Sequence, residues 1–214
     1  LAMGGGRIGD MKRSVPAFAD ALDLTRSRVG LLSFYRNVEF LSELTDDRAA
    51  LVAAAEGFFP RPGTNLVMAL RGLHELLRRG RATASPDTAE VAILLVGSAD
   101  EGDPLDVEAE AQALKDDGIL VVTVALGGGA DLALLERLAS TPEHVHAEGT
   151  SALYPDLLRH IAGTLGIIRL TGAEVQDRLP PDMPLVWGSD VPPGLPRGDA
   201  LVWRYAVWPD DGAT

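Results

Sequence analysis

Oxygen-bearing side chains stand where the sequence predicts the start of a helix. Thr64 lies in the string Pro62-Gly63-Thr64-Asn65-Leu66, directly before an apolar helical pattern that continues to about Arg79. A hydroxyl beside the free backbone N–H groups of a helix start can take part in binding an anion or in holding metal-ligating oxygens. The same hydroxyl can instead serve as an ordinary helix N-cap, since threonine is common at that position.

Two acidic residues are candidates to share a metal site with Thr64. Asp100 lies in the loop from Gly97 to Gly102, and Asp103 lies just before a predicted helix that begins at Pro104. Hydroxyl and carboxylate oxygens favour Mg²⁺, Ca²⁺ or Mn²⁺ over zinc. Each aspartate also has an ordinary interpretation, as a loop residue or as a helix cap.

Other residues that could do chemistry give weaker patterns. His144 and His146 have a metal-like spacing on one face of a short strand, but no third ligand of matching type is near, which favours solvent-exposed edge histidines. Gly127 to Gly129 lack the G-x-G-x-x-G spacing of a nucleotide-binding turn and are interpreted as a strand-to-helix turn. Ser33 and Ser98 lie in no hydrolase motif, so we do not expect an enzyme.

Composition limits the classes of partner. The 214 residues carry a formal net charge of −12 and are 46% hydrophobic, which suits a folded chain but not one that neutralises nucleic-acid phosphates. The chain has no cysteine, which excludes disulfides and thiol chemistry. No stretch approaches the roughly 18 apolar residues of a membrane span. The first residues have no signal-peptide pattern, so we expect any targeting segment to lie outside this chain.

Strands and helices alternate over the first 166 residues. Apolar periodicity predicts helices at 10–24, 47–56, 66–79, 104–116, 132–139 and 153–165, and strands at 28–35, 38–41, 89–96, 119–126 and 144–147. The runs at 89–96 and 119–126 are continuously apolar, as in parallel strands buried on both faces. This order predicts a doubly wound α/β domain whose functional crevice lies at the carboxyl ends of the strands.

The composition changes after Gly166. Prolines accumulate there, all three tryptophans fall in this part, and Ala200 to Val207 alternate like a β-strand. We therefore expect residues 167–214 to form part of a separate β module. The final Asp-Gly sequence is typical of a hairpin turn, which suggests that this module continues beyond Thr214.

Three strings resemble a von Willebrand factor A-type domain in their order and spacing. They are Arg28-Val29-Gly30-Leu31-Leu32-Ser33-Phe34, Pro62-Gly63-Thr64-Asn65-Leu66, and Asp117-Gly118-Ile119 through Gly127. The resemblance covers residues 1–166. It implies a mostly parallel central sheet with helices on both faces and a metal-ion-dependent adhesion site at the carboxyl edge of the sheet.

In that family three loops hold the metal, and Thr64 matches the threonine of the second loop. The first loop, Asp-x-Ser-x-Ser, is expected just before the start of this chain. The third loop usually reads Thr-Asp-Gly, whereas this chain reads Val96-Gly97-Ser98 at that place. The nearest acids that could replace the missing aspartate are Asp100, Glu101 and Asp103. The resemblance thus implies a Mg²⁺ or Ca²⁺ site centred on Thr64.

The resemblance also implies a central strand that this chain does not contain. Its absence would leave two neighbouring strands with unpaired N–H and C=O groups, so we expect another chain or a missing segment to supply it. Residues 167–214 are similar to β-sandwich modules of bacterial surface proteins, on the strings Asp177-Arg178-Leu179-Pro180-Pro181 and Trp187-Gly188-Ser189.

Two functions follow as expectations. The first is a non-enzymatic, adhesion-type module that binds a protein partner, with an acidic side chain of the partner completing the metal site. The second is a metal-free structural scaffold within a larger surface assembly. Both suit an extracellular or cell-envelope location. A nucleotide-binding α/β enzyme is a third possibility, but only the generic fold and Gly127 to Gly129 favour it.

Overall fold

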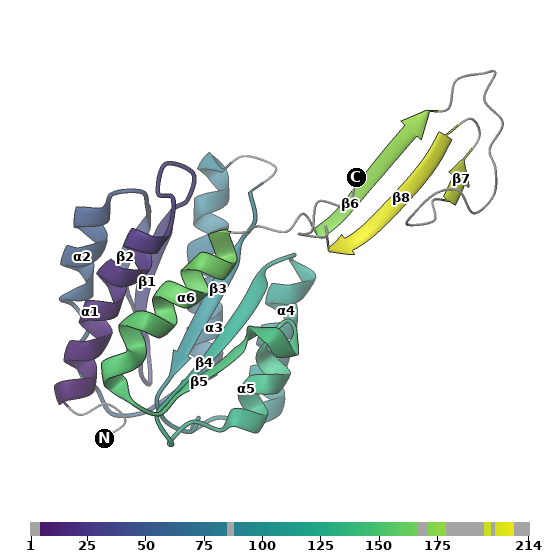
Figure 1. Ribbon diagram of the computed structural model, residues 1–214. Coiled ribbons are helices and arrows are strands. Elements are labelled where there is room, and N and C mark those ends of the chain that lie inside the picture. The colour runs from purple at the N-terminus through teal and green to yellow at the C-terminus, as the bar shows by residue number, and fades with distance from the viewer. Residues whose placement is uncertain (1–4, 85–87, 167–170, 179–194, 198–199, 208–214) are drawn as a thin grey trace. The chain divides into compact units, whose positions relative to one another are not determined.

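The computed structural model of the chain describes residues 5–84, 88–166, 171–178, 195–197 and 200–207 (Figure 1). The chain forms two compact units, Leu1–Gly166 and Ile167–Thr214. Among the described residues, none of the helices combines the length and the apolar character needed to cross a membrane.

The first unit alternates helices and strands, and its α/β fold confirms the predicted fold class. Its strands are β1 (Val29–Phe34), β2 (Val38–Thr45), β3 (Val91–Val96), β4 (Leu120–Leu126) and β5 (Val145–Glu148). Its α-helices are α1 (Gly5–Ala21), α2 (Arg48–Ala55), α3 (Leu66–Gly80), α4 (Pro104–Asp116), α5 (Leu132–Leu138) and α6 (Tyr154–Gly166). Short 3-10 turns lie at Arg81–Thr83, Pro142–His144 and Ser151–Leu153.

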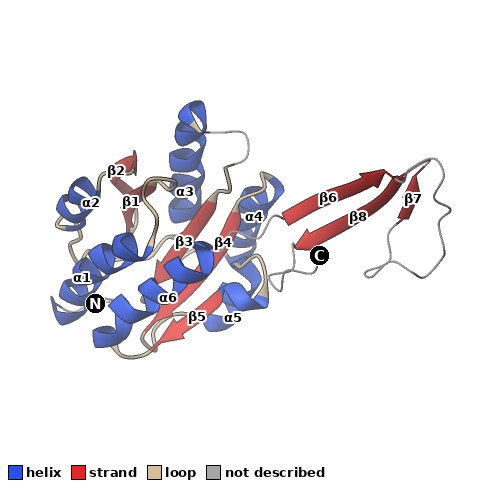
Figure 2. Ribbon diagram, turned by 45° about the horizontal axis from the view of Figure 1, so that its top comes forward, coloured by secondary structure: helices blue, strands red, loops and turns tan. Residues whose placement is uncertain are grey.

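Strands β3, β4 and β5 form a parallel sheet in that order, covered by helices on both faces (Figure 2). Alternate residues of β3 explain the two layers. Ala92, Leu94 and Val96 are buried in a core with α3, α4 and α5, whereas Val91, Ile93 and Leu95 pack into a second core with α1 and α6. Because both faces are apolar, the strand reads as one continuous hydrophobic run in the sequence.

The expected single sheet is divided into two. Strands β1 and β2 form an antiparallel pair, and no hydrogen-bonded ladder joins β1 to β3 within the described residues. Helix α3 contacts both β1 and β3, so both strands lie under the same helix. All six residues of β1 are only partly buried. One edge of β1 and one edge of β3 therefore have no strand partner within the described part of the chain.

The second unit contains an antiparallel sheet. It consists of β6 (Thr171–Arg178), β7 (Leu195–Arg197) and β8 (Ala200–Val207), in the order β6-β8-β7. Strand β8 coincides with the strand that the alternating sequence predicts. The Leu179-Pro180-Pro181 turn, Trp187 and Trp208 lie outside the described residues, and the likeness to bacterial β-sandwich modules stays a prediction.

Candidate functional site

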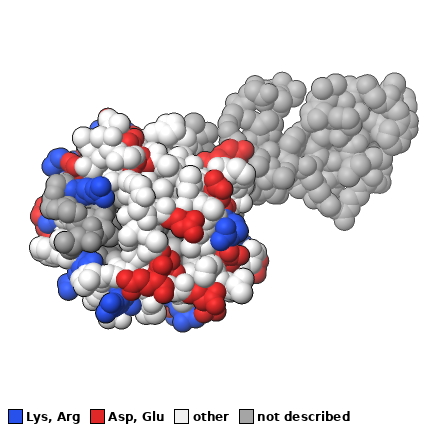
Figure 3. Space-filling view, turned by 90° about the horizontal axis from the view of Figure 1, so that it is seen from below, with Lys and Arg blue, Asp and Glu red and all other residues white. Residues whose placement is uncertain are grey.

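Three loops meet at the edge of the sheet where the parallel strands have their carboxyl ends. The loop before α3 contains Thr64, the loop after β3 contains Ser98 and Asp100, and the loop after β4 contains Gly127 to Gly129. Figure 3 looks onto this edge and shows several Asp and Glu side chains on it, with Lys and Arg side chains among and around them. We refer to it below as the carboxyl edge.

Thr64 is directed into this edge rather than toward the helix that follows it. Its side chain is buried, and its Oγ1 atom lies 2.5 Å from Oγ of Ser98. The N-cap of α3 is Asn65, whose side-chain oxygen accepts a hydrogen bond of 3.0 Å from the N–H of Met68. The interpretation of Thr64 as a helix cap is therefore wrong, because Asn65 already has that role.

Asp100 joins the same cluster through backbone groups. One carboxylate oxygen accepts the N–H of Leu66 at 2.8 Å, and the other accepts the N–H of Gly102 at 3.1 Å. The N–H of Glu101 donates to the carbonyl of Thr64 at 2.9 Å. These bonds fasten the loop after β3 to the start of α3. They bring Thr64, Ser98 and Asp100 together from two distant parts of the sequence.

Asp103 lies at the start of α4 instead. Its side chain is exposed and accepts the N–H of Leu105 at 2.9 Å, so it is the N-cap of that helix. Among the described residues, no hydrogen bond joins Asp103 to Thr64 or Ser98. Ser98 replaces it as the third member of the cluster. Its place two residues after the end of β3 is the sequence signal that could have indicated this.

The cluster offers a partial ligand set for a hard cation. Thr64 and Ser98 supply hydroxyls and Asp100 supplies a carboxylate, whereas Mg²⁺ and Ca²⁺ take six or more oxygens. Within the described part of the chain, no group of three or more His, Cys, Asp or Glu residues could hold a metal ion. A cation at this edge would therefore need further oxygens, such as those of water, backbone carbonyls or a partner.

The loop after β4 packs tightly against the loop after β3. Gly127 has a φ of 78°, which favours glycine, and the chain turns there from β4 toward α5, as predicted. A Cβ atom added to Gly129 would lie 2.8 Å from the carbonyl oxygen of Gly97. Gly128, by contrast, faces open space. The two loops thus form one continuous surface.

The histidines lie away from this cluster. His144 belongs to the turn before β5, and His146 lies on β5 with its ring 6.4 Å from that of His160 in α6. Burial lowers the pKa of His146, and the neighbouring His160 and His144 lower it further. This arrangement is a partly buried histidine pair at a sheet edge.

The comparison with protein families identifies this α/β unit. The model of the von Willebrand factor type A domain matches residues 2–160. The chain belongs to the von Willebrand factor type A family. The predicted family is thereby confirmed for this part of the chain. No curated protein sequence matches the chain.

Solved structures show the same von Willebrand factor A fold at low sequence identity. Proximal thread matrix protein 1 of the mussel byssus, described with a zinc-occupied metal-ion-dependent adhesion motif, is 20% identical with a TM-score of 0.68, over 81% of this chain and 45% of that protein. A von Willebrand factor type A protein of Catenulispora acidiphila is 15% identical with a TM-score of 0.67, over 94% and 50%. The corresponding domain of a type V pilus tip protein from Porphyromonas gingivalis is 17% identical with a TM-score of 0.64, over 78% and 91%. The chain thus spans half or less of the first two proteins.

Proposed function

We propose that this von Willebrand factor A domain is an adhesion-type protein-binding module that uses its carboxyl edge. The observation that carries the proposal is the clustering of Thr64, Ser98 and Asp100 where three loops meet. Ligands of open α/β sheets bind outside the carboxyl ends of the strands, because the loops there are positioned by a rigid scaffold. The likeness to a pilus tip protein supports an adhesive role, and that the module is non-enzymatic is part of the proposal.

Matched substitutions at two open glycines can test which surface binds. Gly128 lies in the loop after β4, and Gly163 lies near the far end of α6; a Cβ atom at either position meets no atom within 4 Å. Each is therefore a suitable place to introduce a larger side chain. The immobilised chain is incubated with a mixture of extracellular or cell-envelope proteins. We expect Gly128→Arg to abolish the retention of a partner protein, whereas Gly163→Arg should leave that retention unchanged. Equal retention of the partner by both variants would contradict the proposal that the carboxyl edge is the binding surface.

A divalent cation, Mg²⁺ or Ca²⁺, is a second element of the proposal. Thr64, Ser98 and Asp100 would provide part of its ligands, and an acidic side chain of the partner would provide another. When bound, such a cation supplies a positive charge to which a partner carboxylate can bind. The zinc-occupied motif of the byssus protein supports a divalent cation in this family.

Calorimetric titration of the chain with Mg²⁺ and with Ca²⁺ tests the cation directly. Thr64→Val keeps the side-chain shape and removes the hydroxyl, so we expect it to weaken any binding. Thr141→Val, in the exposed turn before β5, is the matched control. A binding heat that is the same in Thr64→Val as in the parent chain would exclude Thr64 as a ligand.

The split sheet favours a second candidate, a metal-free scaffold subunit. The unpaired edges of β1 and β3 leave backbone groups that a further strand would pair. Such a strand from another polypeptide segment would link this unit into an assembly. Sedimentation and circular dichroism of the isolated chain test this. A stable, well-folded monomer would contradict the scaffold. We further propose a location outside the cell or in the cell envelope, which the likeness to a pilus tip protein supports.

A further inference from the structure

Large apolar side chains are exposed around the carboxyl edge. They are Phe59, Leu105, Leu132 and Leu153, with 60%, 73%, 42% and 45% of their surface accessible. Each lies where the chain approaches or begins a helix from this edge: before α3, in the first turn of α4, at the start of α5, and just before α6. Among the described residues, the remaining large exposed apolar side chain is Phe40, on β2. Exposed apolar groups that gather on one face indicate an interaction surface.

Acidic side chains surround two of these leucines. Residues 98–106, which include Leu105, contain four acidic residues and no Lys, Arg or His. Residues 127–136, which include Leu132, contain Asp131 and Glu136 and again no basic residue. The close approach of Gly129 to the carbonyl of Gly97 places these two segments side by side. We call residues 98–106 and 127–132 the acidic apolar rim.

Helix capping explains only part of this pattern. Asp103 and Asp131 accept backbone N–H groups as the N-caps of α4 and α5, an ordinary structural role. Capping does not need a leucine that is 73% exposed two residues after Asp103. Glu101 and Asp106 are exposed acids that cap no helix. Glu101 lies 3.7 Å from Arg36, a long contact between two exposed side chains that leaves its carboxylate open to solvent. The leucines and these two acids are therefore accessible to a partner.

We propose that the acidic apolar rim binds a partner surface on which apolar side chains are flanked by Lys and Arg. The proposal rests on the proposed use of the carboxyl edge and names the chemistry of its partner. Leu105 and Leu132 would lose water-exposed surface on contact. The surrounding carboxylates would attract basic side chains and set the orientation of the complex. A partner surface that is mostly acidic would meet like charges along the rim, even if one of its carboxylates completes a cation site at Thr64.

Three synthetic peptides of equal length can test the partner chemistry on the full chain. The first alternates Leu and Arg, the second replaces Arg by Glu, and the third replaces Leu by Gly. Fluorescence anisotropy in the presence of EDTA, and again with Mg²⁺, reports binding. We expect the Leu/Arg peptide to bind about tenfold or more tightly than either of the others, with affinity falling as salt rises.

Matched variants then locate the binding surface. Leu105→Ala with Leu132→Ala should weaken the Leu/Arg peptide about tenfold, whereas Phe40→Ala should leave it unchanged. Glu101→Gln with Asp106→Asn should weaken binding a few fold and reduce its salt dependence. Glu143→Gln with Asp116→Asn makes the same charge change at the other end of the sheet and should have little effect. Circular dichroism confirms that each variant is folded.

The outcomes separate this inference from the proposed function. Preference for the Glu peptide, with binding still blocked by Gly128→Arg, would overturn the basic-apolar partner and leave the carboxyl edge in place. Equal weakening by the rim and control charge variants would mean that the peptide follows the overall charge of the chain. That result would overturn the proposal that the acidic apolar rim is the binding surface. Insensitivity to Gly128→Arg would contradict the proposed function itself.

Discussion

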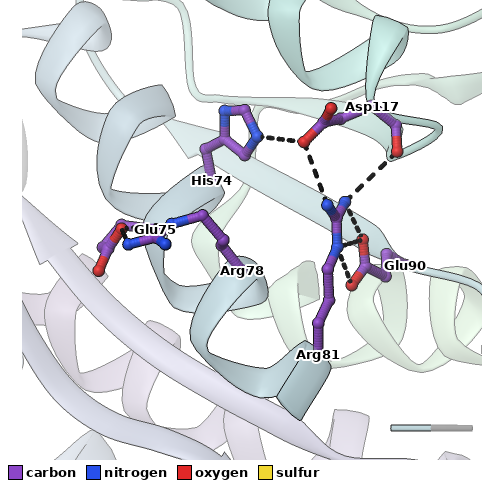
Figure 4. Close-up of polar contacts among 6 residues, drawn as sticks. All are labelled: His74, Glu75, Arg78, Arg81, Glu90 and Asp117. Carbon is purple, nitrogen blue, oxygen red and sulfur yellow. Dashed lines mark hydrogen bonds and ion pairs between the residues drawn. The ribbon is translucent and has the colours of Figure 1, made fainter.

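Charged side chains have different contacts at the two ends of the parallel sheet. At the amino ends of β3 and β4, Arg81 lies between Glu90 and Asp117, at 2.6 Å and 3.2 Å (Figure 4). His74 closes the set with a 2.8 Å contact to Asp117. This network joins the end of α3 to the residues that lead into β3 and β4. We call it the amino-end network.

At the carboxyl edge, three acids contact backbone N–H groups instead. Asp100, Asp103 and Asp131 accept backbone N–H groups, and Glu101 meets Arg36 only at 3.7 Å. We infer that the amino-end network contributes to the stability of the fold, whereas the carboxyl edge leaves charged and apolar side chains available to a partner. Substitutions can break this contrast at either end.

The largest effect is expected where the carboxyl-edge loops touch. In Gly129→Ala the new Cβ would lie 2.8 Å from the backbone oxygen of Gly97, so the two loops must separate. Overpacking of this kind costs about 1–3 kcal/mol. We expect urea denaturation to show that loss of stability, together with weaker binding at the edge.

Gly128→Ala is the matched control, because a Cβ atom at that position faces open space. It should leave the free energy of unfolding nearly unchanged. If both alanine variants unfold alike, the loops after β3 and β4 are not held in close contact. The continuous surface assigned to the rim would then be lost.

A smaller effect is expected at the amino end. Arg81→Ala removes the partner of Glu90, whose side chain is only 16% exposed, and one partner of Asp117. We expect a loss of about 1 kcal/mol, because the network exceeds a single exposed pair. Arg78→Ala breaks the Glu75 pair within α3 and should cost less. Equal losses measured by urea denaturation would show that the network adds nothing beyond ordinary surface pairs.

Local signals allowed much of the fold to be predicted. Asp103 and Pro104 mark the start of α4, and the predicted range of that helix matches the structure. The start of α1 was placed too late, since Gly5 and Gly6 have low helix propensity and carry no start signal. The ends of β3 and β4 were placed closely because polar loops bound their apolar runs.

The site was less predictable, since its contacts join distant residues. Asn65 and Thr64 can both cap a helix, and only the tertiary contact with Ser98 shows which one does not. The helix-start pattern indicated Thr64, the family resemblance gave it the role of a ligand, and Asp100 was indicated by its place in the loop from Gly97 to Gly102. Nothing local indicated that Arg81 would meet Glu90 and Asp117, because such ion pairs depend on how α3 packs against the sheet.

The smallest expected effect is a change in acid sensitivity at the amino end. The hydrogen bond from His74, followed by that from Arg81, lowers the pKa of Asp117 below its ordinary value of 3.8. A carboxylate whose pKa is lowered on folding stabilises the protein above its unfolded pKa, and this stabilisation is lost as the pH falls through the folded pKa. We therefore expect Asp117→Asn to reduce the pH dependence of stability below 3.8, measured by urea denaturation across that range. Asp116→Asn, at the neighbouring residue that accepts a hydrogen bond from Gln112, is the control and should retain more of that dependence. If the two variants show the same acid profile, Asp117 gains nothing from its partners, and the contrast between the two ends of the sheet rests on Arg81 and Glu90 alone.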